Sequence, residues 1–243
     1  MGMRKISIII PCAGRGTRLG IPYPKEMFAL EADKVLIDYC FEMLRELKDR
    51  VCIVVIISKE KMELVNYLSK YTEEYEIIFL YQKPQCAELL GAIESAKYYF
   101  SDVNILMLPD IRIVDSDVAN HMNSIILKTD AEGMVFGAVR EKRLEIIERM
   151  GALKTMDDRV ISFKDKPRDG VNEFDSFWVM LSWVGERSDE FLEQLGRIYQ
   201  ASDKFIFSNS LFYRKPVVFF QQAMDMGVWE NIYDYQNRKS NHS

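Results

Sequence analysis

Histidine is scarce in this chain of 243 residues, which contains only His121 and His242. Two histidines exclude most histidine-based zinc sites and leave little for acid–base catalysis by imidazole. Cysteine is also infrequent, and no C-x-x-C pair occurs among Cys12, Cys40, Cys52 and Cys86. We expect these four residues to be buried free thiols, which are typical of a reducing compartment. The sequence therefore predicts a cytoplasmic protein.

No apolar run is long enough to span a bilayer, so we expect no membrane partner. The apolar run after Lys5 is too short for a signal peptide. A formal net charge of −5 argues against a nucleic-acid partner, so any phosphate binding must come from a local cluster of cations. No linker rich in Gly, Ser or Pro divides the chain. We expect one domain over residues 1–236, with a nucleotide-binding half (1–130), an acceptor-binding half (131–236) and a frayed tail (237–243).

In the first half, apolar β-branched runs alternate with amphipathic stretches. The sequence predicts strands at Ile6–Ile10, Val51–Ile57, Ile77–Tyr81 and Ile105–Leu108, and helices at Lys34–Lys48, after a Ser58 cap, at Glu88–Phe100 and at Val118–Leu127. Alternation of this kind favours a parallel sheet with right-handed crossovers. We therefore predict an α/β fold with a Rossmann-like, doubly wound mixed sheet. Ligands in such sheets bind beyond the carboxyl ends of the strands.

The second half is richer in aromatic residues and strand patterns, and we interpret it as an inserted substrate-binding lobe. The sequence predicts strands at Met134–Val139 and Phe177–Trp183, a hairpin of Gly151–Thr155 with Val160–Lys164, helices at Ser188–Tyr199 and Asp203–Tyr213, and short strands at Pro216–Phe220 and Gly227–Ile232. Trp178 and Trp183 could stack on a sugar or pack in the core. We interpret Asp115-Ser116-Asp117 as the start of a helix rather than as a metal-binding triplet.

Glycines and basic residues stand together in the stretch Ile8–Leu30, directly after the first predicted strand. Gly14 and Gly16 would let backbone N–H groups approach a ligand, and successive N–H groups form a concavity that binds anions. Arg18 and Lys25 add the positive charge that a polyphosphate requires. The spacing fits neither a P-loop, which closes on Gly-Lys-Ser/Thr, nor the dinucleotide fingerprint, which needs a third glycine.

The pattern G-x-G-T-R-L, followed by a short spacer and P-K, resembles the sugar-1-phosphate nucleotidyltransferases, also called nucleoside-diphosphate-sugar pyrophosphorylases. The run Pro24-Lys25-Glu26-Met27 is most similar to the bacterial UDP-glucose pyrophosphorylase branch. The resemblance implies the nucleotidyltransferase fold, magnesium as cofactor, and two substrates. These are a nucleoside triphosphate (UTP, dTTP or CTP) and a phosphorylated small molecule, most naturally a sugar 1-phosphate. Pyrophosphate would be released, and both a monomer and a homo-oligomer remain open.

The resemblance also implies roles for single residues. The triphosphate would be cradled by Ala13, Gly14, Arg15, Gly16 and Thr17. Arg18 would contact the β- and γ-phosphates, Lys25 would neutralise charge at the α-phosphorus, and Asp110 would ligate magnesium. Gln82 falls where the family places a base-reading glutamine, although a polar residue at a strand end is nearly as good an interpretation. The run Glu88–Gly91 departs from the family's small-residue turn, which leaves base recognition open.

The segment Phe163–Pro167 resembles the family's E-K-P segment. This similarity implies that Lys166 contacts the acceptor phosphate and that Asp165 binds a sugar hydroxyl. A Lys-Pro pair by itself is usually a solvated turn, and its place after a predicted hairpin strand favours the functional interpretation.

Near the C-terminus the family commonly reads G-x-W-x-D-x-G-T, and its aspartate is the second metal ligand. Here Asn231 stands at that position, and a neutral amide should bind magnesium more weakly than a carboxylate. Either Glu230 or Asp234 substitutes for the aspartate, or the second metal site is lost. Two alternatives therefore stay open beside sugar-1-phosphate transfer. One is a cytidylyltransferase that acts on a non-sugar phosphate or phosphonate, and the other is a catalytically weak regulatory protein that binds a nucleotide sugar.

Overall fold

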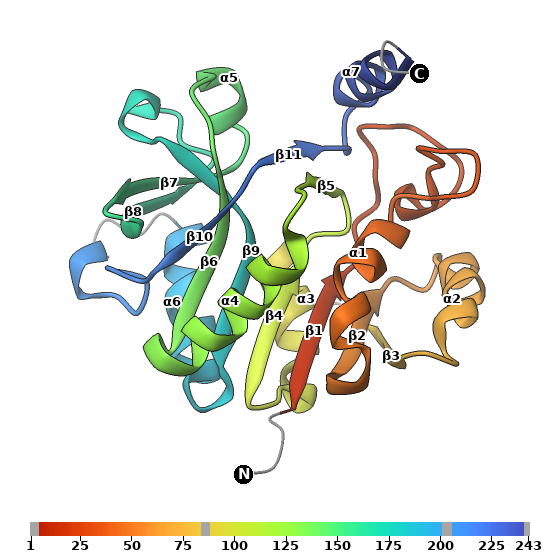
Figure 1. The fold of residues 1–243 in the computed structure, drawn as a ribbon, viewed down its shortest axis with the longest axis horizontal. Helices are drawn as coiled ribbons and strands as arrows, with labels where there is room; N and C mark the ends of the chain where they lie inside the picture. The colour runs from red at the N-terminus through yellow and green to blue at the C-terminus, as the bar shows by residue number, and fades with distance from the viewer. Residues whose placement is uncertain (1–4, 84–87, 201–205, 241–243) are drawn as a thin grey trace.

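The computed structural model describes residues 5–83, 88–200 and 206–240. Nine of the described strands form one mixed sheet, with the main order β10-β6-β9-β4-β1-β2-β3 and with β7 and β8 beside β9 (Figure 1). The strands are β1 (Ile6–Pro11), β2 (Val51–Ile57), β3 (Glu76–Tyr81), β4 (Val103–Met107), β5 (Ile111–Val114), β6 (Met134–Arg140), β7 (Gly151–Met156), β8 (Arg159–Asp165), β9 (Ser176–Val184), β10 (Val217–Phe220) and β11 (Gln222–Asp225). The helices are α1 (Asp38–Met43), α2 (Met62–Leu68), α3 (Glu88–Ser95), α4 (Val118–Glu132), α5 (Leu144–Ile147), α6 (Ser188–Tyr199) and α7 (Trp229–Ser240).

The sheet is parallel through β3, β2, β1 and β4, and β9 then runs antiparallel to both β4 and β6. The parallel strands are continuous apolar runs because helices cover both of their faces. One face packs against α1, α2 and α4, and the other packs against α3 and α6. The prediction of a mixed Rossmann-like α/β sheet is confirmed.

The two aromatic residues of β9 that could have stacked on a sugar lie in the core. Trp183 is fully buried, stacks on Phe191 with ring centroids 4.0 Å apart, and donates its indole N–H to Ser188 Oγ at 3.1 Å. Trp178 is also buried, with 3% of its surface exposed. Both residues therefore stabilise the sheet from the side that carries α6.

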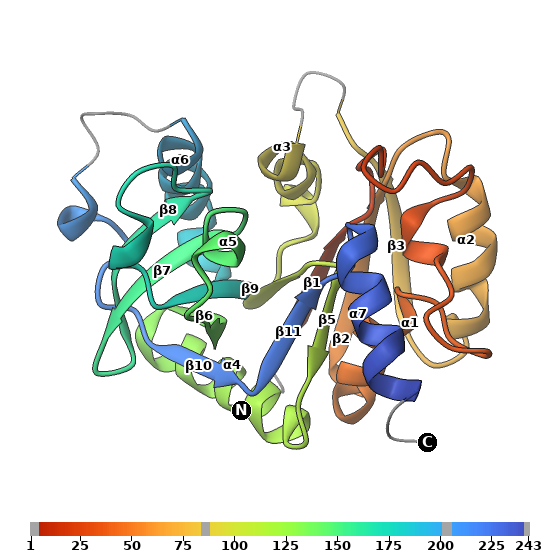
Figure 2. The ribbon, with the colours of Figure 1, turned by 90° about the horizontal axis from the view of Figure 1, so that it is seen from above.

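A separate two-stranded ribbon of β5 and β11 lies beside the carboxyl ends of β1 and β4 (Figure 2). After this ribbon the chain enters α7, which packs on the loop that follows β1. Trp229 of α7 donates its indole N–H to the backbone oxygen of Leu19 at 2.9 Å, and its ring meets Phe28 edge to face at 5.6 Å. The end of the chain thus braces the loop that carries the family motif.

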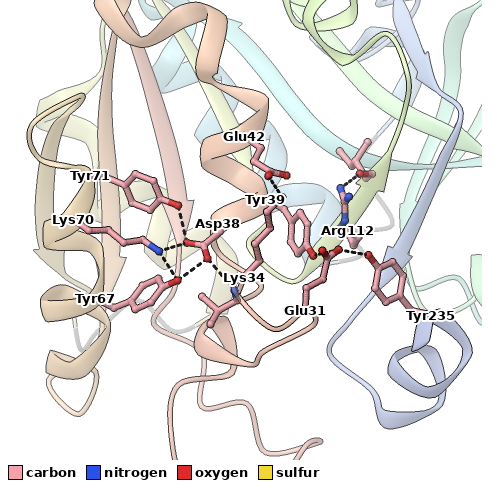
Figure 3. A network of polar contacts seen from close by, with 12 residues as sticks. Glu31, Lys34, Asp38, Tyr39, Glu42, Tyr67, Lys70, Tyr71, Arg112 and Tyr235 are labelled. Carbon is pink, nitrogen blue, oxygen red and sulfur yellow. Dashed lines mark hydrogen bonds and ion pairs between the residues drawn. The ribbon is translucent and has the colours of Figure 1, made fainter. Parts of the chain in front are cut away.

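Two polar networks hold α1, one toward α2 and the other toward α7 (Figure 3). Asp38 accepts hydrogen bonds from the hydroxyls of Tyr67 and Tyr71 at 2.6 and 2.8 Å, and it pairs with Lys70 at 3.1 Å. In the second network Glu31 Oε1 accepts from the hydroxyl of Tyr39 at 2.8 Å and from that of Tyr235 in α7 at 3.1 Å.

Several local predictions are wrong. The predicted strand Gly227–Ile232 is instead the start of α7, because Ile232 packs one helical turn away from Trp229 in a small apolar cluster. The helix continues to Ser240, through most of the expected tail. Of the predicted helix Asp203–Tyr213, residues 203–205 lie outside the described ranges, and the only helical turn in the rest is the 3₁₀ helix Phe207–Asn209. Within Lys34–Lys48 the α-helix spans only Asp38–Met43.

The predicted caps also differ. Lys61 and Arg187, rather than Ser58 and Ser188, hold the N-cap positions of α2 and α6. The triplet Asp115-Ser116-Asp117 precedes α4, as predicted, and Asp117 is the N-cap residue, but its side chain makes no capping hydrogen bond. The carboxylate of Asp115 accepts instead from the backbone N–H of Asp117 at 2.7 Å and from that of Gln221 at 2.8 Å, which ties α4 to the β10–β11 connection.

Cys12 and Cys40 are buried free thiols and Cys52 is a half-buried one, as predicted, whereas Cys86 lies outside the described residues. Among the helices in the described ranges, none combines the length and apolar character that a bilayer crossing requires.

Candidate active site

Lys25 and Asp110 form a close ion pair at the carboxyl edge of the sheet. Lys25 opens the 3₁₀ helix Lys25–Met27 after the glycine-containing loop, and Asp110 follows β4. Lys25 Nζ lies 2.5 Å from Asp110 Oδ2, and only 14% and 18% of the two side chains are exposed. Burial by itself would lower the pKa of Lys25, but the adjacent Asp110 carboxylate outweighs it and the pKa is raised. Lys25 therefore stays protonated at neutral pH.

A second carboxylate, Asp225, joins this pair from the end of β11. Asp225 is in register with Ile111 on β5, and the next residue, Met226, donates its backbone N–H to Asp110 O at 2.7 Å. Burial and the nearby Asp110 charge both raise the pKa of Asp225. The two carboxylates thus lie close enough for their charges to repel each other.

Arg18 approaches the same carboxylate from the loop after β1. Arg18 Nη1 lies 3.5 Å from Asp225 Oδ2, and more than half of the arginine side chain is exposed. Gly227 makes this approach sterically feasible, because a β-carbon there would lie 2.9 Å from Arg18 Nη2 and 2.8 Å from Asp225 Oδ1. Arg18 is therefore held near the carboxylates while remaining open to a ligand from solvent.

The loop between β1 and Arg18 has the geometry that its glycines suggest. Gly16 has φ +64°, and a β-carbon there would lie 3.3 Å from Lys25 Cβ, so a side chain at this position would be strained and crowded. Ala13 packs against the core below the loop, whereas Gly14, Arg15 and Thr17 are exposed. The predicted triphosphate cradle is thus a solvent-open loop beside Lys25.

The predicted base and acceptor residues gather elsewhere, around Glu88 at the start of α3. Gln82 Nε2 donates to Glu88 O at 2.9 Å, and the negative charge of Glu88 acts on half-buried Asp165. Burial is the main cause of the raised pKa of Asp165. Lys166 is exposed, and its φ of +46° lets its backbone N–H reach Met150 O at 3.0 Å.

The side-chain amide of Asn231 is hydrogen-bonded to the main chain next to the site. It lies in the first turns of α7, and its Nδ2 donates to the backbone oxygen of Asp225 at 2.7 Å. Glu230 is exposed and faces Arg149 at 4.0 Å, and Asp234 is exposed. The carboxylate beside Asp110 is thus Asp225, six residues before the position that the motif comparison suggested, and Asn231 supports the turn that carries it.

Comparison with known proteins decides the family. A sequence profile described as nucleotidyl transferase matches residues 7–238. The chain belongs to the nucleotidyl transferase family. No curated protein sequence matches this nucleotidyltransferase. The family predicted from the loop motif is confirmed.

Solved structures of sugar-1-phosphate nucleotidyltransferases share the fold. A UDP-glucose pyrophosphorylase from Acinetobacter baumannii has a TM-score of 0.75 and 16% identity, over 99% of this chain and 94% of its own. A Bacillus anthracis protein described as a glucose-1-phosphate thymidylyltransferase has a TM-score of 0.75 and 16% identity, over 96% and 94%. A UDP-glucose pyrophosphorylase complexed with UDP-glucose has a TM-score of 0.72 and 19% identity, over 99% and 100%. At this identity the likeness shows the fold of the nucleotidyltransferase.

The donor set of the site suits magnesium. Within the described residues no group of three or more His, Cys, Asp or Glu side chains could hold a metal ion by itself. Asp110 and Asp225 offer two carboxylates from adjoining strands, and the raised pKa of Asp225 reflects their mutual repulsion as well as burial. Magnesium is commonly held by one or two carboxylates together with substrate phosphate oxygens. A nucleotide-bound magnesium therefore fits this pair.

Proposed function

We propose that the chain transfers a nucleoside monophosphate from UTP, dTTP or CTP to a sugar 1-phosphate, with release of pyrophosphate and with magnesium as cofactor. The observation that carries the proposal is the alternation of cations and carboxylates, Lys25 with Asp110 and Arg18 with Asp225, at the carboxyl edge of the sheet. A phosphoryl-transfer site needs such a constellation because both reactants are anions. Structural neighbours named for UDP-glucose and glucose 1-phosphate chemistry support this choice.

In the reaction an oxygen of the acceptor phosphate attacks the α-phosphorus and the bond to the pyrophosphate breaks. Lys25, shielded from solvent and protonated, would stabilise the charge that develops at the α-phosphate. Arg18 would leave Asp225 for the departing phosphates, a small movement for an exposed side chain. Asp110 and Asp225 would hold the magnesium, which neutralises phosphate charge and acts as a Lewis acid when bound.

The acceptor would bind near the β7–β8 hairpin. Lys166 offers an exposed ammonium group to the acceptor phosphate, and Asp165 offers a carboxylate to a hydroxyl. Gln82 stands at the carboxyl end of β3, where it could read the base. Because Asp225 supplies a second carboxylate, Asn231 no longer favours a weak regulatory protein over an enzyme.

The test is a pyrophosphate-release assay with UTP, dTTP, CTP, ATP and GTP, each combined with glucose 1-phosphate, phosphocholine or 2-aminoethylphosphonate. We expect magnesium-dependent release with a pyrimidine nucleotide and glucose 1-phosphate, and loss of release in EDTA. Release only with phosphocholine or the phosphonate would transfer the proposal to a cytidylyltransferase. Binding of UTP without release in any combination would contradict transferase activity.

A further inference from the structure

Glu26 and Lys61 form a buried ion pair, and Glu26 is the residue after Lys25 of the proposed reaction centre. Glu26 has no exposed surface and Lys61 has 6%, and both carboxylate oxygens of Glu26 accept from Lys61 Nζ, at 2.9 and 2.8 Å. Glu26 follows Lys25 in the same 3₁₀ helix, whereas Lys61 stands in the turn between β2 and α2. The mechanism described above uses neither residue.

Stability alone is a poor explanation for such a pair. The desolvation of two charges can exceed their mutual attraction, and well-packed apolar side chains of similar volume are often equally stabilising. The backbone of Glu26 is already fixed, because its oxygen accepts from the N–H of Ile37 at 2.9 Å. The role of the pair is therefore to be sought in its charges.

The charges of this cluster are those of Lys25, Lys61 and Glu26. The thiol of Cys12 also lies near these charges, but burial raises its pKa, so it remains neutral. Lys61 neutralises Glu26, and Asp110 pairs with Lys25. Without Lys61, Glu26 would be a buried carboxylate without its paired cation, and the positive charge of Lys25 also acts on it.

We propose that Lys61 is a positioning residue that occupies Glu26 and thereby leaves Lys25 free to engage Asp110 and the substrate phosphate. This inference rests on the proposed function, because it takes Lys25 as the cation at the α-phosphate. Glu26 competes with Asp110 for Lys25, since the charge of each carboxylate acts on the same ammonium group. Lys61 settles the competition in favour of Asp110, at 2.5 Å from Lys25.

Three variants separate charge balance from a structural role. Lys61→Met removes the positive charge, Glu26→Met/Lys61→Met removes both charges and so leaves the net charge unchanged, and Glu26→Gln removes only the competing carboxylate. We expect Lys61→Met to lower kcat for pyrophosphate release at least about tenfold, with KM for UTP changed less than about threefold. The double variant and Glu26→Gln should retain kcat within about threefold of the original protein.

Lys70→Met is the matched control, because it removes the lysine partner of another shielded carboxylate, Asp38, away from the site. It should lower the unfolding temperature without changing kcat. An unchanged kcat in folded Lys61→Met, or a double variant as slow as the single one, overturns the inference. If Lys61→Met does not fold, Glu26→Gln and the double variant test the inference. A large loss of kcat in both variants then overturns it.

A crystal structure of Lys61→Met, or of Lys61→Gln if the first variant does not fold, gives a readout that needs no activity. We expect Lys25 Nζ to have left Asp110 Oδ2 and to lie within hydrogen-bonding distance of Glu26. An intact contact at the original 2.5 Å overturns the inference. Absence of pyrophosphate release from the unmodified protein would refute the proposed function instead, while this structural comparison would still judge the role of Lys61.

Discussion

The substitution Asp225→Asn should make the protein more stable and less active at once. Asp225 is mostly buried, and both burial and the Asp110 charge raise its pKa. A carboxyl group whose pKa is higher in the folded than in the unfolded chain binds protons preferentially in the folded state, so its contribution to stability worsens as pH rises. The asparagine carries no charge, and its oxygen can still accept from the N–H of Gly227, which lies 2.7 Å from Asp225 Oδ1.

Two opposing effects set the expected change in the free energy of unfolding. Loss of the pairing with Arg18 should cost at most about 1 kcal/mol, because the arginine is exposed and such pairs are worth roughly 0–1 kcal/mol. Removal of a buried charge beside Asp110 should stabilise the folded state by more than this cost. We expect a net gain of about 1 kcal/mol at pH 8, or a rise of about 2–4 °C in Tm for a chain of this size. The gain should disappear as pH falls through the pKa of the folded carboxyl group.

Differential scanning fluorimetry from pH 3 to pH 8, without metal, measures the stability term. A pyrophosphate-release assay measures the activity. We expect turnover of Asp225→Asn to fall at least about 100-fold, since metal-ion catalysis contributes several kcal/mol of charge stabilisation. Magnesium with UTP should raise the Tm of the original protein and have little effect on Asp225→Asn. A lower Tm for Asp225→Asn at pH 8, or turnover close to normal, would refute the assignment of Asp225 as a metal-binding carboxylate.

Three further expectations follow from the described contacts. Lys25→Ala should slow pyrophosphate release at least about 100-fold, whereas the exposed control Lys128→Ala on α4 should leave release unchanged; equal rates would remove Lys25 from the mechanism. Gly151→Ala should cost about 1–3 kcal/mol in urea unfolding, because a β-carbon there would lie 1.9 Å from Trp178 Nε1. For Asp38, burial raises the pKa but hydrogen bonds to two tyrosine hydroxyls outweigh it, so the pKa is lowered. Its stabilisation is present at neutral pH and is lost as pH falls through the folded pKa, so Asp38→Asn should destabilise the protein by about 1–3 kcal/mol at pH 7 and by much less at pH 2.

The parallel strands of the sheet could be predicted because each can be recognised from its own apolar sequence. The runs Val51–Ile57 and Ile105–Leu108 are apolar throughout, and a strand covered on both faces needs that composition. The residues after β4 could be placed for the same reason, since parallel strands end at a common edge. Lys25 and Asp110 were thus predictable as neighbours even though 85 residues separate them.

The C-terminal part of the site could not be predicted in this way. The stretch Gly227–Ile232 is short, with apolar residues at Val228, Trp229 and Ile232, and such runs do not distinguish a strand from the first turns of a helix. Strand β11 (Gln222–Asp225) has four half-buried residues and pairs only with β5, so its local sequence carries no clear alternation. Asp225 at the end of β11 was therefore not predicted, whereas Asn231 was, because it fits the motif spacing. The side chain of Asn231 donates a hydrogen bond to the backbone oxygen of Asp225.

The site is assembled from three segments that lie far apart in sequence, so its geometry must come from tertiary packing. Closing the long loops between these segments costs conformational entropy, and the local structural preferences of Lys25, Asp110 and Asp225 do not offset that cost. The β5–β11 ribbon fixes the two carboxylates relative to each other, because Met226 and Asp110 share a backbone hydrogen bond. Helix α7 then fixes the phosphate loop relative to both, through the hydrogen bond from Trp229 to Leu19. The cations and the carboxylates are thus held by separate contacts that meet in α7, because Trp229 binds the phosphate loop and Asn231 binds the backbone of Asp225.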